Sequence, residues 1–263
     1  MSINKKELIE LIENIASPEL MESWDNTGMQ IELKNENIEK ILVCLDICEE
    51  TIDEAIQKGC DFIVSHHPLF FFPLKRISCE EAKGALAVKL IEAGISVYAA
   101  HTSFDKVEGG NNDYLAELLE LEDVFAPQEE PIMRVGRLSN PISLAGFCDL
   151  VDKKVMGGKG LSYSGELDRQ IETVGICTGA GASLMPAALA NGCDVLLTGD
   201  VKYHEFQQAE EAGMALIDAG HFETEITFAD NMGARLEKAL NGKAEVFPAK
   251  SQKNSLKRFF SMA

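Results

Sequence analysis

The sequence predicts an α/β protein made of two similar halves related by internal duplication, with a metal site in the cleft between them. Short runs rich in β-branched residues alternate with amphipathic stretches, which is the pattern of β-α-β units. This alternation occurs twice along the chain with matching residues, which indicates a repeat. Histidines and carboxylates follow the strands of both copies, where α/β sheets bind ligands.

In the first half, residues 1–125, the periodicity of a helix comes first and a β-α-β unit follows. The opening helix ends at Ser17-Pro18, because proline cannot continue it. The apolar stripe of this helix consists of Leu8, Ile9, Leu11, Ile12 and Ile15. The β-α-β unit consists of a strand at Ile41–Leu45, a helix at Glu49–Lys58 and a strand at Phe62–Val64.

The second half, residues 166–263, repeats this order. A strand at Val174–Cys177, a helix ending near Ala190 and a strand at Val195–Leu197 align without a gap with the first copy. The clearest match is Gly59-Cys60-Asp61 with Gly192-Cys193-Asp194. Each copy then continues into another apolar run, Val97–Ala100 in the first and Ala215–Ile217 in the second.

Residues 126–165 are interpreted as the connection between the halves. They contain three prolines and the glycine cluster Gly157-Gly158-x-Gly160, around one predicted helix at Ser143–Val151. The glycine cluster lacks the spacing of a phosphate-binding loop.

Composition excludes several classes of protein. Apolar residues make up 46% and charged residues 25%, as in ordinary globular proteins. The amino terminus has no apolar segment that would direct secretion or membrane insertion, so we expect a cytoplasmic protein with no membrane partner. The seven scattered cysteines form no C-x-x-C pair, which disfavours a disulfide scaffold and a thiolate zinc site. We expect them to be buried as small apolar residues.

The chain is strongly acidic. With 43 acidic and 24 basic residues the formal charge is −19, so a polyanionic nucleic acid would meet net repulsion. We therefore predict no general nucleic-acid binding. The C-terminal basic residues are interpreted as a solvated end of the chain, and they are Lys250, Lys253, Lys257 and Arg258.

Three predicted strand ends carry histidines and carboxylates. These segments are Ser65-His66-His67-Pro68, His101-x3-Asp105 and His221-x3-Glu225. Imidazole and carboxylate together are the ligand set for Zn²⁺, Fe²⁺, Mn²⁺ or Co²⁺. Adjacent histidines could each bind a different ion, so the sequence predicts two divalent metal ions per chain. The alternative is that these histidines are hydrogen-bonded loop residues without a metal.

Two other segments have two interpretations each. Gly179-Ala180-Gly181-Ala182-Ser183 lies between a strand and a helix, and either binds an anion such as a substrate phosphate or makes a tight turn that needs small residues. Trp24 with the turn at Asn26-Thr27-Gly28 is either a buried aromatic anchor or a substrate contact.

Five segments in this order resemble the signature segments of the NIF-three-like proteins, also named GTP cyclohydrolase 1 type 2 homologues. The resemblance spans essentially the whole chain. The segments are Trp24-Asp25-Asn26-Thr27-Gly28-Met29-Gln30, Ser65-His66-His67-Pro68-Leu69-Phe70, His101-x3-Asp105, Gly199-Asp200-Val201-Lys202-Tyr203-His204 and Ala219-Gly220-His221-x3-Glu225.

The resemblance implies a dinuclear metal centre and a toroidal homohexamer. His101 then falls outside the ligand set and is a tentative catalytic acid or base, with a structural role as the alternative. Asp200 and His204 fall near the site but outside the ligand set. The metal ligands that the resemblance implies are His66, His67, Asp105, His221 and Glu225.

Together these features favour a metal-dependent hydrolase of the cyclohydrolase type, acting on a small phosphorylated or nucleotide substrate. The alternative is a non-catalytic metal-binding scaffold, carrier or sensor, because only an open coordination position distinguishes the two. A serine or cysteine hydrolase is poorly supported, since neither Ser65 nor Ser103 lies in a nucleophile-elbow pattern.

Overall fold

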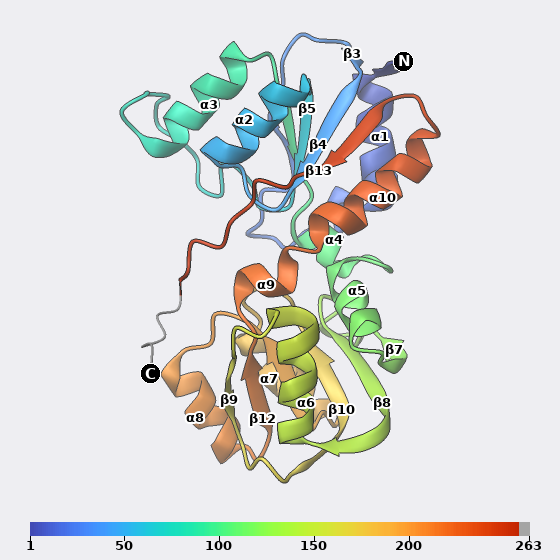
Figure 1. Cartoon of the computed structure of the whole chain (residues 1–263), viewed down its shortest axis with the longest axis vertical. Helices are drawn as coiled ribbons and strands as arrows, with labels where there is room; N and C mark the ends of the chain where they lie inside the picture. Colours follow the sequence, from blue (N-terminus) through green and yellow to red (C-terminus); the bar gives the residue numbers. More distant parts are fainter. Residues whose placement is uncertain (258–263) are drawn as a thin grey trace. The chain divides into compact units, whose positions relative to one another are not determined.

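The computed structural model describes residues 1–257, and the chain divides into two compact units. Unit 1 comprises Met1–Gly110 and Phe228–Lys253, and unit 2 comprises Asn111–Thr227 and, within the described residues, 254–257. Each unit contains its own mixed sheet flanked by helices, so the predicted α/β class is confirmed (Figure 1). Among residues 1–257, no helix has the length and apolar composition needed to cross a bilayer.

Unit 1 contains a five-stranded sheet in the order β13-β4-β5-β6-β2. Neighbouring strands are parallel except for β2, which pairs antiparallel with β6. A separate antiparallel pair joins β1 (Ile3–Asn4) to β3 (Asn37–Ile38). The strands of the larger sheet are β2 (Gly28–Ile31), β4 (Lys40–Cys44), β5 (Phe62–Ser65), β6 (Ser96–Ala99) and β13 (Glu245–Pro248).

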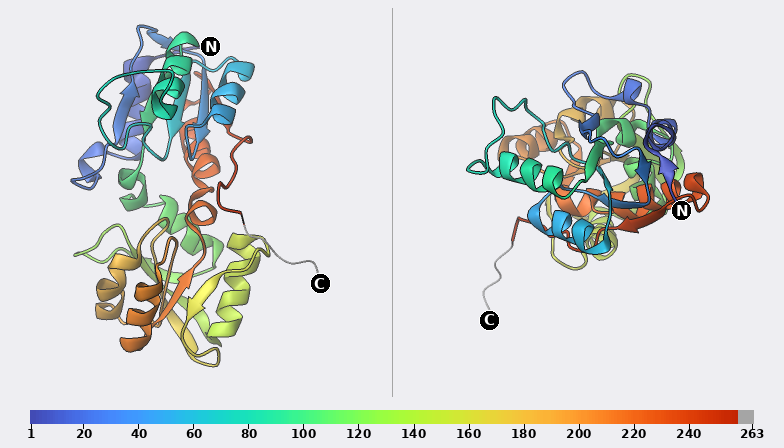
Figure 2. Two further views of the ribbon diagram at one scale, coloured as in Figure 1. Left: turned by 90° about the vertical axis from the view of Figure 1, so that its left-hand side faces the viewer. Right: turned by 90° about the horizontal axis from the view of Figure 1, so that it is seen from above.

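Helices cover both faces of this sheet, because its central strands are apolar on both sides (Figure 2). Ile41 and Val43 pack with α1 and α10, whereas Leu42 and Cys44 pack with α2 and α3 on the opposite face. Gly59 ends α2 with a φ of 70°, a left-handed conformation that favours glycine. The helices are α1 (Lys5–Ile15), α2 (Glu49–Lys58), α3 (Ala82–Glu92), α4 (Thr102–Lys106) and α10 (Phe228–Leu240), with a 3-10 turn η1 (Pro18–Leu20).

Unit 2 contains a six-stranded sheet in the order β7-β8-β10-β11-β12-β9. The three central strands β10, β11 and β12 are parallel, and the outer strands pair antiparallel with their neighbours. The strands are β7 (Glu122–Phe125), β8 (Arg134–Ser143), β9 (Ser162–Ser164), β10 (Gln170–Ile176), β11 (Val195–Thr198) and β12 (Ala215–Asp218).

The helices of unit 2 also lie on both faces of its sheet. One face packs on α5 and α6, and the other on α7 and α8. Ser143 caps α6 by accepting a hydrogen bond from the Gly146 amide, so the predicted helix at Ser143–Val151 is confirmed. The helical segments are α5 (Asn111–Leu118), α6 (Leu144–Val151), the π-helix η2 (Asp152–Met156), the 3-10 turn η3 (Ala182–Leu184), α7 (Met185–Ala190), α8 (Tyr203–Glu211) and α9 (His221–Glu225).

The two aligned β-α-β units make the same hydrogen bonds at matching positions. The Asp61 carboxylate accepts from the amides of Glu39 and Lys40, at 3.0 and 3.2 Å. The Asp194 carboxylate accepts from the amides of Glu172 and Thr173, both at 2.9 Å. The helix stops also match, because Gly59 and Gly192 have φ angles of 70° and 71°. These contacts support the gap-free alignment behind the predicted duplication.

The boundaries of the units differ from those predicted. The C-terminal residues 228–253 do not join the second half, because β13 pairs with β4 and α10 packs on the first sheet (Figure 1). Residues 126–165 are not merely a connection, since β8 and β9 within them are strands of the second sheet. The first half also ends earlier than predicted, because α5 and β7 pack in unit 2.

Most of the cysteines are buried and two of the basic C-terminal residues are exposed, as expected. Cys44, Cys60, Cys177 and Cys193 are buried, but Cys79 is exposed, so the expectation of burial is wrong there. In the C-terminal segment, Lys250 pairs with Asp230 and Lys253 with Glu50 at exposed positions, and Arg258 lies outside the described residues.

Candidate metal-binding site

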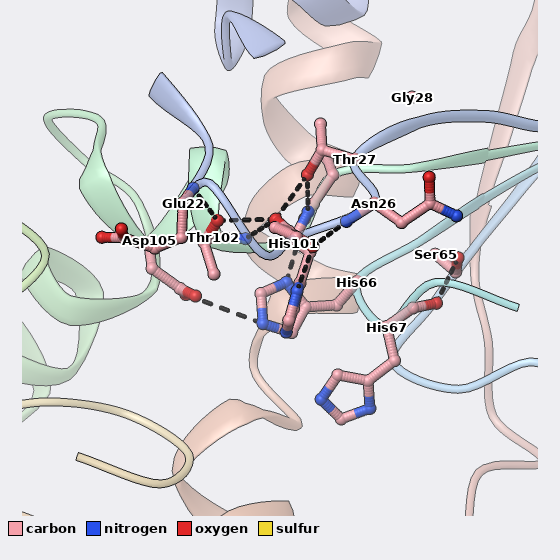
Figure 3. Close-up of polar contacts among 12 residues, drawn as sticks. Glu22, Asn26, Thr27, Gly28, Ser65, His66, His67, His101, Thr102 and Asp105 are labelled. Carbon is pink, nitrogen blue, oxygen red and sulfur yellow. Dashed lines mark hydrogen bonds and ion pairs between the residues drawn. The ribbon is translucent and has the colours of Figure 1, made fainter. Parts of the chain in front are cut away.

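The histidine group of unit 1 lies where β5 and β6 end. His66 and His67 follow β5 directly, and their amides donate to the carbonyls of Cys44 and Leu45 at 3.0 Å each. His101 follows β6 and immediately precedes α4, which carries Asp105. The carboxyl ends of parallel strands thus bring the first two predicted segments together (Figure 3).

The environment of His66 fixes its tautomer. The ring is fully buried, and Nδ1 lies 3.0 Å from the carbonyl oxygen of Ala100. A carbonyl only accepts hydrogen bonds, so Nδ1 carries the proton and a neutral ring presents the lone pair of Nε2. This Nε2 lies 3.6 Å from Oδ1 of the buried Asp105, which is also an acceptor (Figure 3). Because Nε2 of His66 and Oδ1 of Asp105 are both acceptors in a buried place, a cation between them or a second proton on the ring, at Nε2, would stabilise the pair.

His67 and His101 are each oriented by a carboxylate. His67 Nδ1 lies 2.8 Å from Oδ1 of Asp46, and His101 Nδ1 lies 2.7 Å from Oδ1 of Asp25. Histidines that bind metals are commonly held in this way by a carboxylate or carbonyl on the other ring nitrogen. The ring nitrogens of His66, His67 and His101 include three atoms that all lie within 4.8 Å of one another.

The Trp24–Gln30 segment contributes Asp25 to this group. The Asp25 side chain is fully buried. Burial raises its pKa, but His101 and the hydroxyls of Thr102 and Thr27 stabilise the carboxylate and hold the pKa well below its ordinary value. Trp24 itself is 58% exposed, so its interpretation as a buried anchor is wrong. The segment orients His101 through Asp25, a role that the sequence did not predict.

A second group of imidazole and carboxylate lies in unit 2. His221 Nδ1 lies 2.7 Å from Oδ2 of Asp200, and its Nε2 lies 3.0 Å from Oε2 of Glu225. Asp200 has a φ of 54°, which aspartate tolerates better than most residues. Because both partners are carboxylates, the ring is surrounded by negative charge that a bound cation or a ring proton neutralises. The predicted pair His221 and Glu225 is therefore present, with Asp200 as its support.

When the two repeats are aligned, the His-x3-acid motif of unit 2 starts one residue later than that of unit 1. The Ala100 amide donates to the Ser65 carbonyl, and the Ala219 amide donates to the matching carbonyl of Thr198, both at 2.8 Å. His101 follows Ala100 directly, whereas Gly220 separates Ala219 from His221. The motifs are thus similar in chemistry but not strictly equivalent in position.

The glycine loop of unit 2 supports this second group. The Gly179 amide donates to Thr224 Oγ1 at 3.1 Å, and the Gly181 amide donates to Thr198 Oγ1 at 2.7 Å. Gly179 has a φ of 69°, and a Cβ there would overlap the Glu225 carboxylate. These contacts favour the tight turn over the phosphate-binding interpretation.

One predicted residue lies outside both histidine groups, and two residues that orient histidines were not predicted. His204 contacts the ring of Tyr203 and the side chain of Gln207 at an exposed position in α8. Asp46 was missed although it follows the predicted strand Ile41–Leu45 directly, a position that could have identified it. Asp25 gave no such signal, since it is remote in sequence from His101.

Comparisons with known proteins agree with this architecture. The family model described as Duf34/NIF3 (NGG1p interacting factor 3) matches residues 3–255. A Clostridium acetobutylicum protein named GTP cyclohydrolase 1 type 2 homolog is 34% identical over 248 residues, 92% of each chain. A Helicobacter pylori protein named GTP cyclohydrolase 1 type 2 is 34% identical over 225 residues, 85% of this chain and 88% of its own.

Solved structures are similar over nearly the whole length. Reduced HcgD from Methanocaldococcus jannaschii is 30% identical with a TM-score of 0.80, covering 94% of this chain and 98% of that one. A Bacillus cereus protein related to NIF3 has a TM-score of 0.90 at 23% identity, covering 98% and 99% of the two chains. At that identity the likeness shows the fold alone.

Proposed function

Because this chain belongs to the Duf34/NIF3 family, we propose that it binds divalent metal ions and uses them for a hydrolytic reaction. The observation that carries the proposal is the histidine group of unit 1. Three imidazoles approach within 4.8 Å, and Nδ1 of each contacts an acceptor: a carbonyl for His66 and carboxylates for His67 and His101. In this arrangement Nε2 of His66 and of His67 would be the metal donors, with the ring of His101 beside them.

The chemistry of both groups fits a borderline divalent ion. Nitrogen donors with nearby carboxylates and no thiolate suit Zn²⁺, Fe²⁺, Mn²⁺ or Co²⁺ better than Ca²⁺ or Mg²⁺. His66, His67 and Asp105 would hold metal in unit 1, and His221 and Glu225 in unit 2. Two ions per chain stays a prediction, which metal stoichiometry tests.

A metal bound here would supply an activated water at neutral pH. The contribution of the chain is to fix the donors and to move protons. His101 is the candidate acid or base in this role, because Asp25 holds its Nδ1 and leaves its Nε2 directed away from that carboxylate. The names of the relatives make GTP the first substrate to test, followed by other nucleotides, phosphoesters and cyclic amides.

The alternative function is a metal carrier, sensor or scaffold without catalysis. It is compatible with the hydrogen bonds that fix the ligands, because these bonds serve tight binding as well as turnover. Hydrolysis of a substrate by the metal-loaded protein, lost in the ligand variants, separates the two functions.

The test of metal binding is a double variant, His66→Ala with His221→Ala. We expect it to remain folded but to lose bound metal, because the hydrophobic cores of both units lie outside the two groups. Elemental analysis and circular dichroism of the purified proteins measure the two quantities. His204→Ala is the control, since this exposed histidine lies outside both groups. Metal content equal to that of the control would show that the ligand assignment is wrong.

A further inference from the structure

The C-terminal segment 249–252 lies beside the loop that follows β4. It continues directly from β13, the partner of β4. The amides of Lys250 and Ser251 both donate to the Glu54 carboxylate at 2.9 Å. The segment is therefore held in a defined position immediately before Gln252.

Gln252 binds two consecutive peptides at the end of β4. Its Oε1 accepts hydrogen bonds from the amide of Leu45 and, at 3.3 Å, from the amide of Asp46. A carboxamide oxygen has two lone pairs and so satisfies both donors. Beyond the end of β13, the Gln252 side chain thus accepts the hydrogen bonds that the backbone carbonyls of a longer strand would accept.

The same two residues are the anchors of His67. The carbonyl of Leu45 accepts from the His67 amide at 3.0 Å, and the carboxylate of Asp46 lies 2.8 Å from His67 Nδ1. One anchor fixes the backbone and the other fixes the ring. A single oxygen of Gln252 consequently holds the loop that determines both where His67 lies and which of its nitrogens carries the proton.

We infer that Gln252 is a positioning residue for His67, acting through Leu45 and Asp46, and that the C-terminal segment thereby sets the metal affinity of unit 1. The effect on affinity rests on the proposed function, whereas the effect on the His67 ring does not. His67 is 24% exposed in its side chain, so packing alone leaves it partly unconstrained. The hydrogen bonds through the loop supply the remaining constraint.

Three variants of the full-length protein separate this role from a general effect on stability. Gln252→Leu keeps the size of the side chain but removes the acceptor, and Gln252→Glu keeps an oxygen acceptor. Lys253→Ala is the matched control in the same segment, where the lysine pairs with Glu50 at an exposed site.

Two measurements are made on each protein. The ¹⁵N signals of the His67 ring, recorded on metal-free protein at a pH where the ring is neutral, report which nitrogen is protonated. Calorimetric titration with Zn²⁺ reports affinity. We expect Gln252→Leu to lose the uniform Nδ1–H form and to bind Zn²⁺ about 10-fold more weakly, at the lower end of what supporting residues contribute. Gln252→Glu should keep the wild-type ring signals, because it keeps the acceptor oxygen.

Each outcome decides the question. Wild-type ring signals in Gln252→Leu overturn the inference, as does a Zn²⁺ affinity equal to that of Lys253→Ala. If the wild type binds no metal, the proposed function fails, and the ring signals alone then decide whether Gln252 positions His67.

Discussion

Replacing Gly179 by alanine should weaken metal binding in unit 2 at a modest cost in stability. A Cβ at this position would overlap Oε1 of Glu225 and lie 3.1 Å from its Cδ. It would also lie 3.4 Å from Cε1 of His221. The methyl group therefore displaces the carboxylate that the His221 ring contacts.

The cost in stability has two parts. The φ of Gly179 is +69°, and a residue with a side chain in this region loses about 1–2 kcal/mol. Displacing the Glu225 side chain from its rotamer adds about 0.5–1.5 kcal/mol. The metal affinity should fall by at least the roughly 10–100-fold that loss of a supporting residue causes.

Gly192→Ala provides the matched control. Its φ is +71°, and apart from its chain neighbours no described atom lies within 4 Å of the added Cβ, so it carries the backbone cost alone. Urea unfolding of both metal-free variants measures stability, and Zn²⁺ titration measures affinity. Both variants should be destabilised, but only Gly179→Ala should lose affinity.

Two results would refute this reasoning. Wild-type Zn²⁺ affinity in Gly179→Ala would show that Glu225 either moves without consequence or is not a ligand. An equal loss of affinity in Gly192→Ala would show that general destabilisation, rather than the contact with Glu225, weakens binding.

Three further predictions concern pH, thiols and assembly. Burial raises the pKa of Glu54, but hydrogen bonds from Ser251 and Lys250 outweigh this and lower the pKa. The ionised carboxylate therefore stabilises the fold above the ordinary pKa of 4.5, and this stability is lost in more acidic solution. In urea unfolding, Glu54→Gln should lose less stability than the wild type as the pH falls below 4.5. Iodoacetamide at neutral pH should label the exposed Cys79 well before Cys60. The pKa of the Cys60 thiol is raised to about 11 by burial and by the charge of Asp61. Equal labelling of both cysteines in peptide mass spectrometry would contradict this prediction. Sedimentation should give a mass near six chains, as the family resemblance implies, and a monomer would count against that expectation.

Local patterns were sufficient to predict the elements that carry the site. The predicted helix at Glu49–Lys58 is α2 with the same bounds, and the strand runs at Phe62–Val64 and Val195–Leu197 lie within β5 and β11. These elements are determined by periodicity and by glycine helix stops, which depend on neighbouring residues only.

Long-range pairing explains what could not be predicted. Nothing near β13 in the sequence indicates that it pairs with β4, about two hundred residues earlier, instead of with the nearer second sheet. The partnership of Asp25 with His101 likewise depends on the folded chain. Spacing along the chain identifies metal donors, but not the distant residues that orient them.

The position of β13 has a consequence for synthesis of the protein. The first sheet lacks its edge strand until residues 245–248 have left the ribosome, so one edge of β4 stays unpaired while the intervening residues are made. Residues 111–227, which contain the whole second sheet, form one continuous segment and need no such delay. A nascent chain stopped before residue 245 should therefore contain a protease-resistant second unit and an incomplete first one.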